Sequence, residues 1–243
     1  MFLFVKLASE NGVHVVESLF WRQLAAIPLV LIWFSYSGQL PSIKTNRPAG
    51  HGLRMLLGVS AMGLNFTAFA LLPMAEATVI GFASPIFGTI LAALILREPT
   101  GIYRWGAVLI GFLGVLIVVQ PDSILHIESS IGPFIALAGA LLTAAVSIQI
   151  RQLGKTEKSG TIVFWFSLTS IVPLGVAMLF YASTHEIFVY GYIVALSLCG
   201  ACAQFLLTAA MRYAPVSVVM TMDYTALLWT CLLYTSPSPR DRG

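Results

Sequence analysis

The chain has 243 residues, of which 58% are hydrophobic and only 9% are charged, and its mean hydropathy is +0.89. Soluble domains carry about 25% charged residues, so this composition excludes a soluble globular protein and indicates an all-α protein that crosses a membrane several times. The net charge of +3 is too small to attract nucleic acid, which is not expected as a partner.

Apolar segments of helical length follow one another along the chain. A bilayer core of about 30 Å requires roughly 20 helical residues, so the first segment, residues 1–8, is too short to cross alone. We expect it to be the end of a first helix whose start is missing, because it lacks the features of a signal peptide. Further spans are predicted at 16–36, 53–72, 77–96, 103–119, 131–150, 161–181 and 188–211, with a last one from 216 onward. The turns between these nine helices leave no room for a soluble domain.

Basic residues gather in or beside alternate loops. They are Lys44, Arg47, Arg54, Arg97, Arg104, Arg151, Lys155, Lys158 and Arg212. The intervening loops contain no Lys or Arg and hold Glu10, Glu76, Asp122, Glu128, His185 and Glu186. Since cytoplasmic loops are enriched in Lys and Arg, the basic loops are predicted to lie inside the cell.

The second half of the chain repeats the first. Asn65-Phe66 recurs 139 positions later as Gln204-Phe205, and residues 20–24 (F-W-R-Q-L) are echoed 144 positions later by residues 164–168 (F-W-F-S-L). We therefore predict one copy at residues 1–121 and a second at 131–230. Because the first copy has five spans, an odd number, the second must enter the membrane upside down, which is typical of secondary transporters.

The segment S-P-I-F-G at residues 84–88 leads into L-R-E-P at 96–99 and then into R-W-G-A-V-L-I-G-F-L-G at 104–114. Together with Pro121 and with A-P-V-S at 214–217, this pattern resembles the drug/metabolite transporter superfamily, EamA type. The resemblance implies a ten-helix secondary transporter made of two five-helix repeats, in the cytoplasmic membrane. It identifies the superfamily well and the substrate hardly at all.

Residues 231–243 (C-L-L-Y-T-S-P-S-P-R-D-R-G) are polar where a tenth helix is expected. Codons for Cys231 to Asp241 can be written without a mismatch as the end adapter of a common transposase-based sequencing library. We expect this segment to be non-native and the tenth helix to be missing. The alternative is a real polar tail.

Charged residues inside the spans are the first candidates for function, because charges in a membrane are costly. Lys6 and Glu17 lie near the predicted outer boundary, where snorkelling to the interface is the alternative. Arg22 is too deep for that, and is either a clamp for an anionic substrate group or a structural ion-pair partner. Asp223 is the candidate for proton coupling, with a structural hydrogen bond to Tyr224 or a threonine as the alternative.

Repeat-equivalent polar residues are further candidates. Asn65 and Gln204 occupy matching positions and are predicted, with Arg22 and Tyr224, to bind substrate in a central cavity; the alternative is that the amides hold helices together. Gly81, Pro85 and Gly88 loosen the helix at 77–96 and are predicted to form a structural hinge.

A secondary transporter of small metabolites or drugs accounts for the inverted repeat and the few buried charges together. An integral-membrane enzyme or a channel-like facilitator is the alternative, although no catalytic cluster and no continuous polar lining is apparent in the sequence. The histidines are scattered, so no metal site is predicted, and the absence of a phosphate-binding glycine motif argues against ATP as cofactor. The substrate, the direction of transport and the oligomeric state, a homodimer included, stay open.

Overall fold

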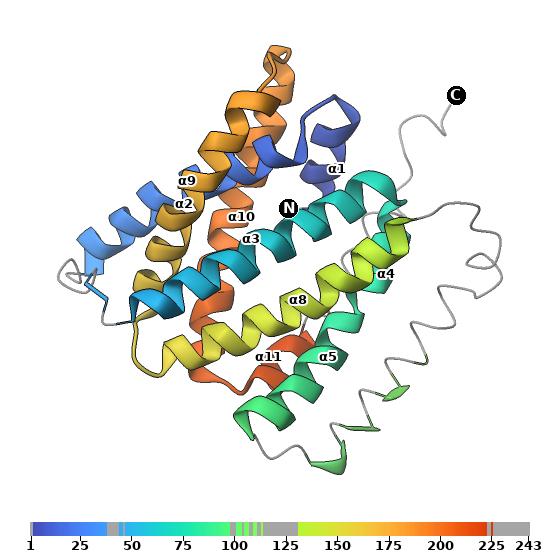
Figure 1. Ribbon diagram of the computed structural model, residues 1–243, viewed down its shortest axis with the longest axis vertical. Coiled ribbons are helices and arrows are strands. Elements are labelled where there is room, and N and C mark those ends of the chain that lie inside the picture. Colours follow the sequence, from blue (N-terminus) through green and yellow to red (C-terminus); the bar gives the residue numbers. More distant parts are fainter. Residues whose placement is uncertain are drawn as a thin grey trace.

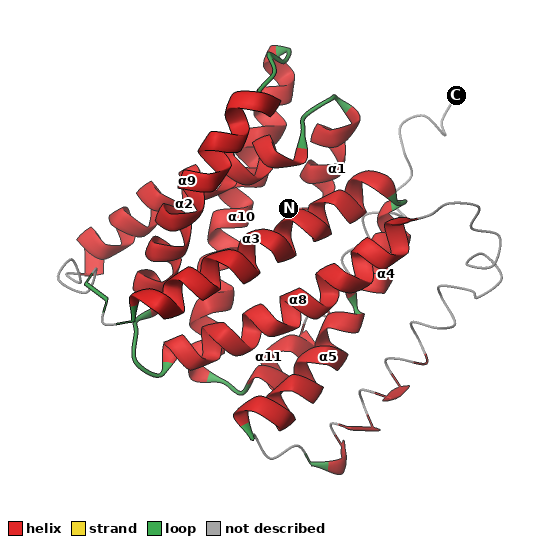
Figure 2. Cartoon of the chain, in the orientation of Figure 1, coloured by secondary structure: helices red, strands yellow, loops and turns green. Residues whose placement is uncertain are grey.

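The computed structural model describes residues 2–37, 44–45, 47–97, 101–103, 105–106, 109–110, 113, 131–222 and 225. Within these ranges the regular structure is helical, without strands (Figures 1 and 2). The helices are α1 (Phe2–Glu10), α2 (Val15–Ser37), α3 (Pro48–Leu71), α4 (Met74–Gly81), α5 (Ala83–Leu91), η2 (Ala92–Leu96), α8 (Ile131–Gly154), α9 (Ser159–Tyr181), α10 (Ile187–Tyr213) and α11 (Val216–Thr221).

Six helical segments of the described chain are long and apolar enough to cross a membrane: 15–36, 48–71, 76–96, 131–154, 159–181 and 187–213. They confirm the prediction of an all-α, polytopic helix bundle. The predicted span at 103–119 and the tail at 231–243 lie largely or wholly outside the described residues. The predicted start of the third span at residue 53 is wrong, because α3 begins at Pro48, where proline is tolerated in the first helical turn.

The predicted continuous helix at 77–96 is divided into α4, α5 and η2. At the first division the backbone N–H of Phe82 bonds to the carbonyls of Thr78 and Val79, which tightens the last turn of α4. At the end of η2, Arg97 adopts a left-handed conformation with φ of 51° and stops the helix. The interruption at Phe82 falls between Gly81 and Pro85, inside the segment predicted to be a hinge.

Repeated helices run in opposite directions. At one end of the bundle, Glu17 near the start of α2 lies 2.9 Å from His185, which follows α9. At the other end, the hydroxyl of Thr45, which follows α2, donates to Glu157, which precedes α9, at 2.8 Å. The start of α2 therefore lies beside the end of α9. Helix α2 thus runs antiparallel to α9, its equivalent in the second copy.

The third helix of each copy follows the same rule. Gln149, near the end of α8, donates to the carbonyl of Gly50 at the start of α3 over 3.2 Å. Arg151, half a turn further along α8, donates to the carbonyl of Arg212 at the end of α10 over 2.8 Å. The start of α3 and the end of α10 thus meet at the same end of the bundle, so these two copies also run in opposite directions.

A hydrogen bond between two equivalent residues marks where the copies meet. Ser167 of α9 donates to the side-chain oxygen of Gln23 of α2 over 3.2 Å, and the two residues are 144 positions apart in the sequence. Gln23 is 1% exposed and Ser167 is fully buried. Helices α2 and α9 also begin 144 positions apart and end 144 positions apart.

Small residues allow the remaining helices to approach closely. Helices α3 and α8 pack along their length, as Figure 1 shows, and a side chain at Gly139 of α8 would meet the side chain of Asn65 at 3.1 Å. Helices α5 and α11 meet at Gly88, which lies against the sulfur of Met220. Close approach at small residues is the usual way in which membrane helices associate.

Candidate functional site

Arg22 joins three helices near the centre of the bundle. It extends from α2, is 4% exposed, and its Nη2 atom donates to the carbonyl of Gly200 at 3.3 Å and to Oε1 of Gln204 at 3.2 Å. Its Nη1 atom lies 2.6 Å from the sulfur of Met62 on α3. A Cβ atom at Gly200 would lie 2.5 Å from Nε of Arg22, so the glycine leaves the space that the guanidinium occupies. The structure thus brings together Arg22 and Gln204, two of the predicted substrate-binding residues.

A second arginine, Arg54, reaches the same region from α3. It was counted with the basic residues in or beside loops, at the start of the span predicted at 53–72, and the structure places it within α3 with 1% exposure. Its guanidinium lies over the ring of Phe166, 3.9 Å from the ring centre, and fills the space that Gly58 leaves free one turn later. Among the described residues, neither Nε nor Nη1 of Arg54 has a hydrogen-bond partner. Its place within the predicted span and its spacing of four residues from Gly58 are the signals in the sequence that could have shown this burial.

Asn65 makes its hydrogen bonds with helix backbones and with α8. Its amide donates to the hydroxyl of Thr143 at 3.0 Å, to the carbonyl of Gly139 at 3.4 Å and to its own helix at Ala61. Gln204 instead bonds to Arg22 on α2. The two equivalent amides thus have different partners, and the contacts of Asn65 favour the alternative that it holds α3 against α8. Substrate binding by either residue stays a prediction.

The other predicted site residues are divided between described and undescribed parts of the chain. Asp223 and Tyr224 lie outside the described residues. Pro85 stands in the first turn of α5, and its carbonyl accepts a hydrogen bond from Thr89 at 2.9 Å. Gly88 lies against Met220, whereas a Cβ atom at Gly81 would meet nothing within 4 Å.

The two charged residues predicted near the outer boundary have partners within the protein. Lys6 donates to the carbonyl of Leu72 over 3.2 Å, at the end of α3. Glu17 is 2% exposed and pairs with His185. Both contacts lie at the end of the bundle that lacks the basic loops.

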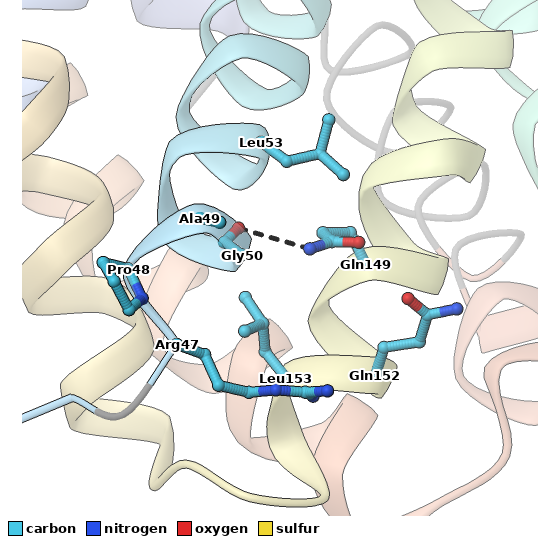
Figure 3. A pocket seen from close by; sticks show the side chains of 8 residues that line it. All are labelled: Arg47, Pro48, Ala49, Gly50, Leu53, Gln149, Gln152 and Leu153. Atoms are coloured by element: carbon cyan, nitrogen blue, oxygen red, sulfur yellow. Dashed lines mark hydrogen bonds between the residues drawn. The ribbon is translucent and has the colours of Figure 1, made fainter.

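A cavity of about 460 Å³ lies at the opposite, basic end, between the start of α3 and the end of α8. Figure 3 shows its polar lining, where Gln149 bonds to the carbonyl of Gly50 and the side chains of Arg47 and Gln152 also contribute. Leu53 and Leu153 supply apolar wall. Among the described residues no group of three or more potential metal ligands occurs.

Comparisons with known proteins show which proteins this chain resembles. Residues 1–120 match the EamA-like transporter family. Over 83% of its length the chain is 26% identical to the riboflavin transporter of Vibrio cholerae, and over 68% it is 30% identical to the S-adenosylmethionine uptake transporter of Rickettsia prowazekii. It covers 67% of the first protein and 55% of the second, and so spans about half to two thirds of their length.

A solved crystal structure has the same fold, with a TM-score of 0.74 at 17% identity over 98% of this chain and 88% of the other. The matched family and both named relatives are transporters, in agreement with the prediction that the chain is not an enzyme. The resemblance in the sequence to EamA-type drug/metabolite transporters is thereby confirmed: residues 1–120 of this multi-pass membrane protein match the EamA-like transporter family, and its relatives are transporters.

Proposed function

We propose that the protein is a secondary active transporter that moves a small metabolite across the cytoplasmic membrane by alternating access. The observation that carries this proposal is the hydrogen bond between Gln23 and Ser167, which joins equivalent residues of two antiparallel copies. Such a bond lies on a pseudo-two-fold axis in the membrane plane. Transporters built from inverted repeats exchange their inward-facing and outward-facing states by rocking about an axis of this kind.

The contacts between α2 and α9 fit such a rocking motion. The two helices are joined in the middle by Gln23 and Ser167, at one end by Glu17 and His185, and at the other by Thr45 and Glu157. Breaking one end contact while the central bond persists opens one side of the membrane and keeps the other closed. The substrate then enters the central region around Arg22 and Gln204.

Small metabolites are the proposed substrates, because the two relatives named above are transporters of riboflavin and of S-adenosylmethionine. Proton coupling through Asp223 and a substrate contact from Tyr224 are part of the same proposal. Both rest on the position of these residues within the last predicted span.

The test is a transport assay on protein expressed from its natural gene and reconstituted in liposomes. A panel that starts with riboflavin and S-adenosylmethionine is screened for uptake and for efflux, with and without a pH gradient. We expect saturable movement of at least one compound that empty liposomes lack. Equal fluxes in protein-containing and empty liposomes across a panel that extends to amino acids, nucleosides and amphipathic drugs would contradict the proposal.

A further inference from the structure

Two guanidinium groups lie in the bundle, and no carboxylate among the described residues neutralises them. Arg22 and Arg54 are 4% and 1% exposed. Over the described ranges of the chain, neither forms an ion pair, whereas Glu17 pairs with His185 at the outer end. A cation buried in a membrane bundle is costly unless an opposite charge meets it, so an uncompensated pair calls for an explanation.

The two groups lie close together along α3. The guanidinium of Arg54 lies at Gly58, and that of Arg22 reaches Met62, one turn further along the same helix. Four helical residues correspond to a rise of about 6 Å. Two positive charges at about this separation repel each other, so an anion between them would relieve the repulsion.

Hydrogen-bond donors without acceptors surround the same region. Within the described part of the chain, Nε of Arg22 and both Nε and Nη1 of Arg54 have no partner. The hydroxyls of Ser170, one turn after Phe166 on α9, and of Ser197, one turn before Gly200 on α10, are also buried there without a partner. Since residues three or four positions apart share a helix face, these hydroxyls lie on the faces that meet the two arginines. Buried polar groups in proteins normally have hydrogen-bond partners. These donors come from four helices, and the partner that they lack is an acceptor.

We propose that Arg22 and Arg54 bind an anionic group, a carboxylate or a phosphate, of the transported molecule. The planar guanidinium matches the two oxygens of either group and forms strong, charge-assisted hydrogen bonds with them. Gln204 and the carbonyl of Gly200 hold Arg22 in position for this contact. This inference rests on the proposed transport function and narrows the substrate to molecules that carry a carboxylate or a phosphate group.

Binding is tested on protein expressed from its natural gene in phosphatidylcholine nanodiscs. The probes are nicotinate against its neutral amide, nicotinamide, and inorganic phosphate against chloride of equal ionic strength. Intrinsic fluorescence reports binding, because Trp21 adjoins Arg22 and Trp165 adjoins Phe166 in the sequence. We expect saturable changes with nicotinate or phosphate and none with nicotinamide or chloride.

Variants assign the binding to the two arginines. Arg22→Gln and Arg54→Gln should each weaken anion binding about tenfold or more, as expected on loss of a charge-assisted hydrogen bond. Arg54→Lys keeps the charge and should bind with intermediate affinity, which separates lost binding from lost folding. Arg47→Gln is the matched control, since Arg47 is exposed just before the same helix. Wild-type affinity in both Gln variants, equal binding of acid and amide, or no saturable anion signal would overturn the inference.

The transport assay separates this inference from the function on which it rests. If the wild-type protein moves neutral compounds and Arg54→Gln moves them equally well, the anion site is wrong and the transport function stands. If anion binding depends on both arginines but no compound moves, the transport function is wrong and the site stands.

Discussion

At the scale of single residues, two glycines determine where the buried charges lie. Gly200 leaves room for the guanidinium of Arg22, and Gly58 leaves room for that of Arg54. A larger side chain in place of either glycine would occupy the space that the guanidinium group needs. The two glycines, which have no functional side chain, therefore determine where the two charges lie.

Gly200→Val should displace Arg22, because even a Cβ atom at this position would lie 2.5 Å from its Nε. Overpacking of this kind typically destabilises a protein by about 1–3 kcal/mol, so the unfolding temperature should fall and anion binding should be lost. Gly191→Val on the same helix is the matched control, since a Cβ atom there meets nothing within 4 Å. Equal unfolding temperatures of the two variants, measured in nanodiscs, would contradict the placement of Arg22.

Asp223→Asn tests proton coupling at a residue that lies outside the described part of the chain. Asparagine keeps the size and hydrogen bonding of the carboxyl group but cannot titrate. We expect the variant to lose accumulation driven by a pH gradient while substrate exchange between the two sides continues. Both are measured in the same proteoliposomes. Accumulation at the wild-type level would identify Asp223 as a structural residue.

At the scale of helices, one predicted span is interrupted. Helix α4 ends at Gly81, and α5 begins at Ala83 after the capping residue Phe82. Interrupted helices in transporters often occur near the substrate site, where their free backbone groups become available. The contact between α5 and α11 therefore bears directly on the centre of the bundle.

Gly88→Ala should weaken the contact between α5 and α11, since the added methyl group overlaps the sulfur of Met220. We expect a loss of about 1–3 kcal/mol in the free energy of unfolding, and Met220→Ala in the same chain should restore part of it. Gly81→Ala is the control for a methyl group added without a clash. Additive effects of the Gly88 and Met220 substitutions would show that the two residues do not touch.

The sequence predicts the helices better than the contacts of the polar residues between them. Hydrophobic length located the spans at 16–36 and 161–181 to within one or two residues of α2 and α9, because the bilayer fixes that length. Arg54 lay at the start of the span predicted at 53–72, but its charge was counted with those of its basic neighbours in the loop before it. Its burial depends on Phe166, which lies on another helix and far along the chain, and periodicity within one helix does not reveal such a contact.

At the scale of the whole molecule, the loops rich in basic residues meet at one end. Two hydrogen bonds join these segments, one between Thr45 and Glu157 and one between Gln149 and Gly50. They bring together the parts of the chain that carry Lys44, Arg47, Arg151, Lys155 and Lys158. At the opposite end, Glu10 is the last residue of α1, and His185 and Glu186 lie between α9 and α10. A bundle with its positive charge at one end has one favoured orientation in a membrane.

Lys155→Cys tests that orientation in intact cells. Lys155 is exposed at the basic end, so a membrane-impermeant thiol reagent should fail to label it from outside until the membrane is permeabilised. Thr184→Cys, exposed at the opposite end, should be labelled in intact cells and serves as the control. Both are made after replacement of the native cysteines. Labelling of Lys155→Cys in intact cells would reverse the assigned orientation.

The bond between Gln23 and Ser167 also bears on how such a chain can arise by gene duplication. In an ancestral antiparallel homodimer, a residue on the axis meets its own copy, and every charge in the site occurs twice. Once the halves share one chain they can diverge, so that Gln23 faces Ser167 and the position of Arg22 is taken by Phe166 in the other half. A symmetric dimer offers its ligand two equivalent orientations, whereas the fused chain offers one.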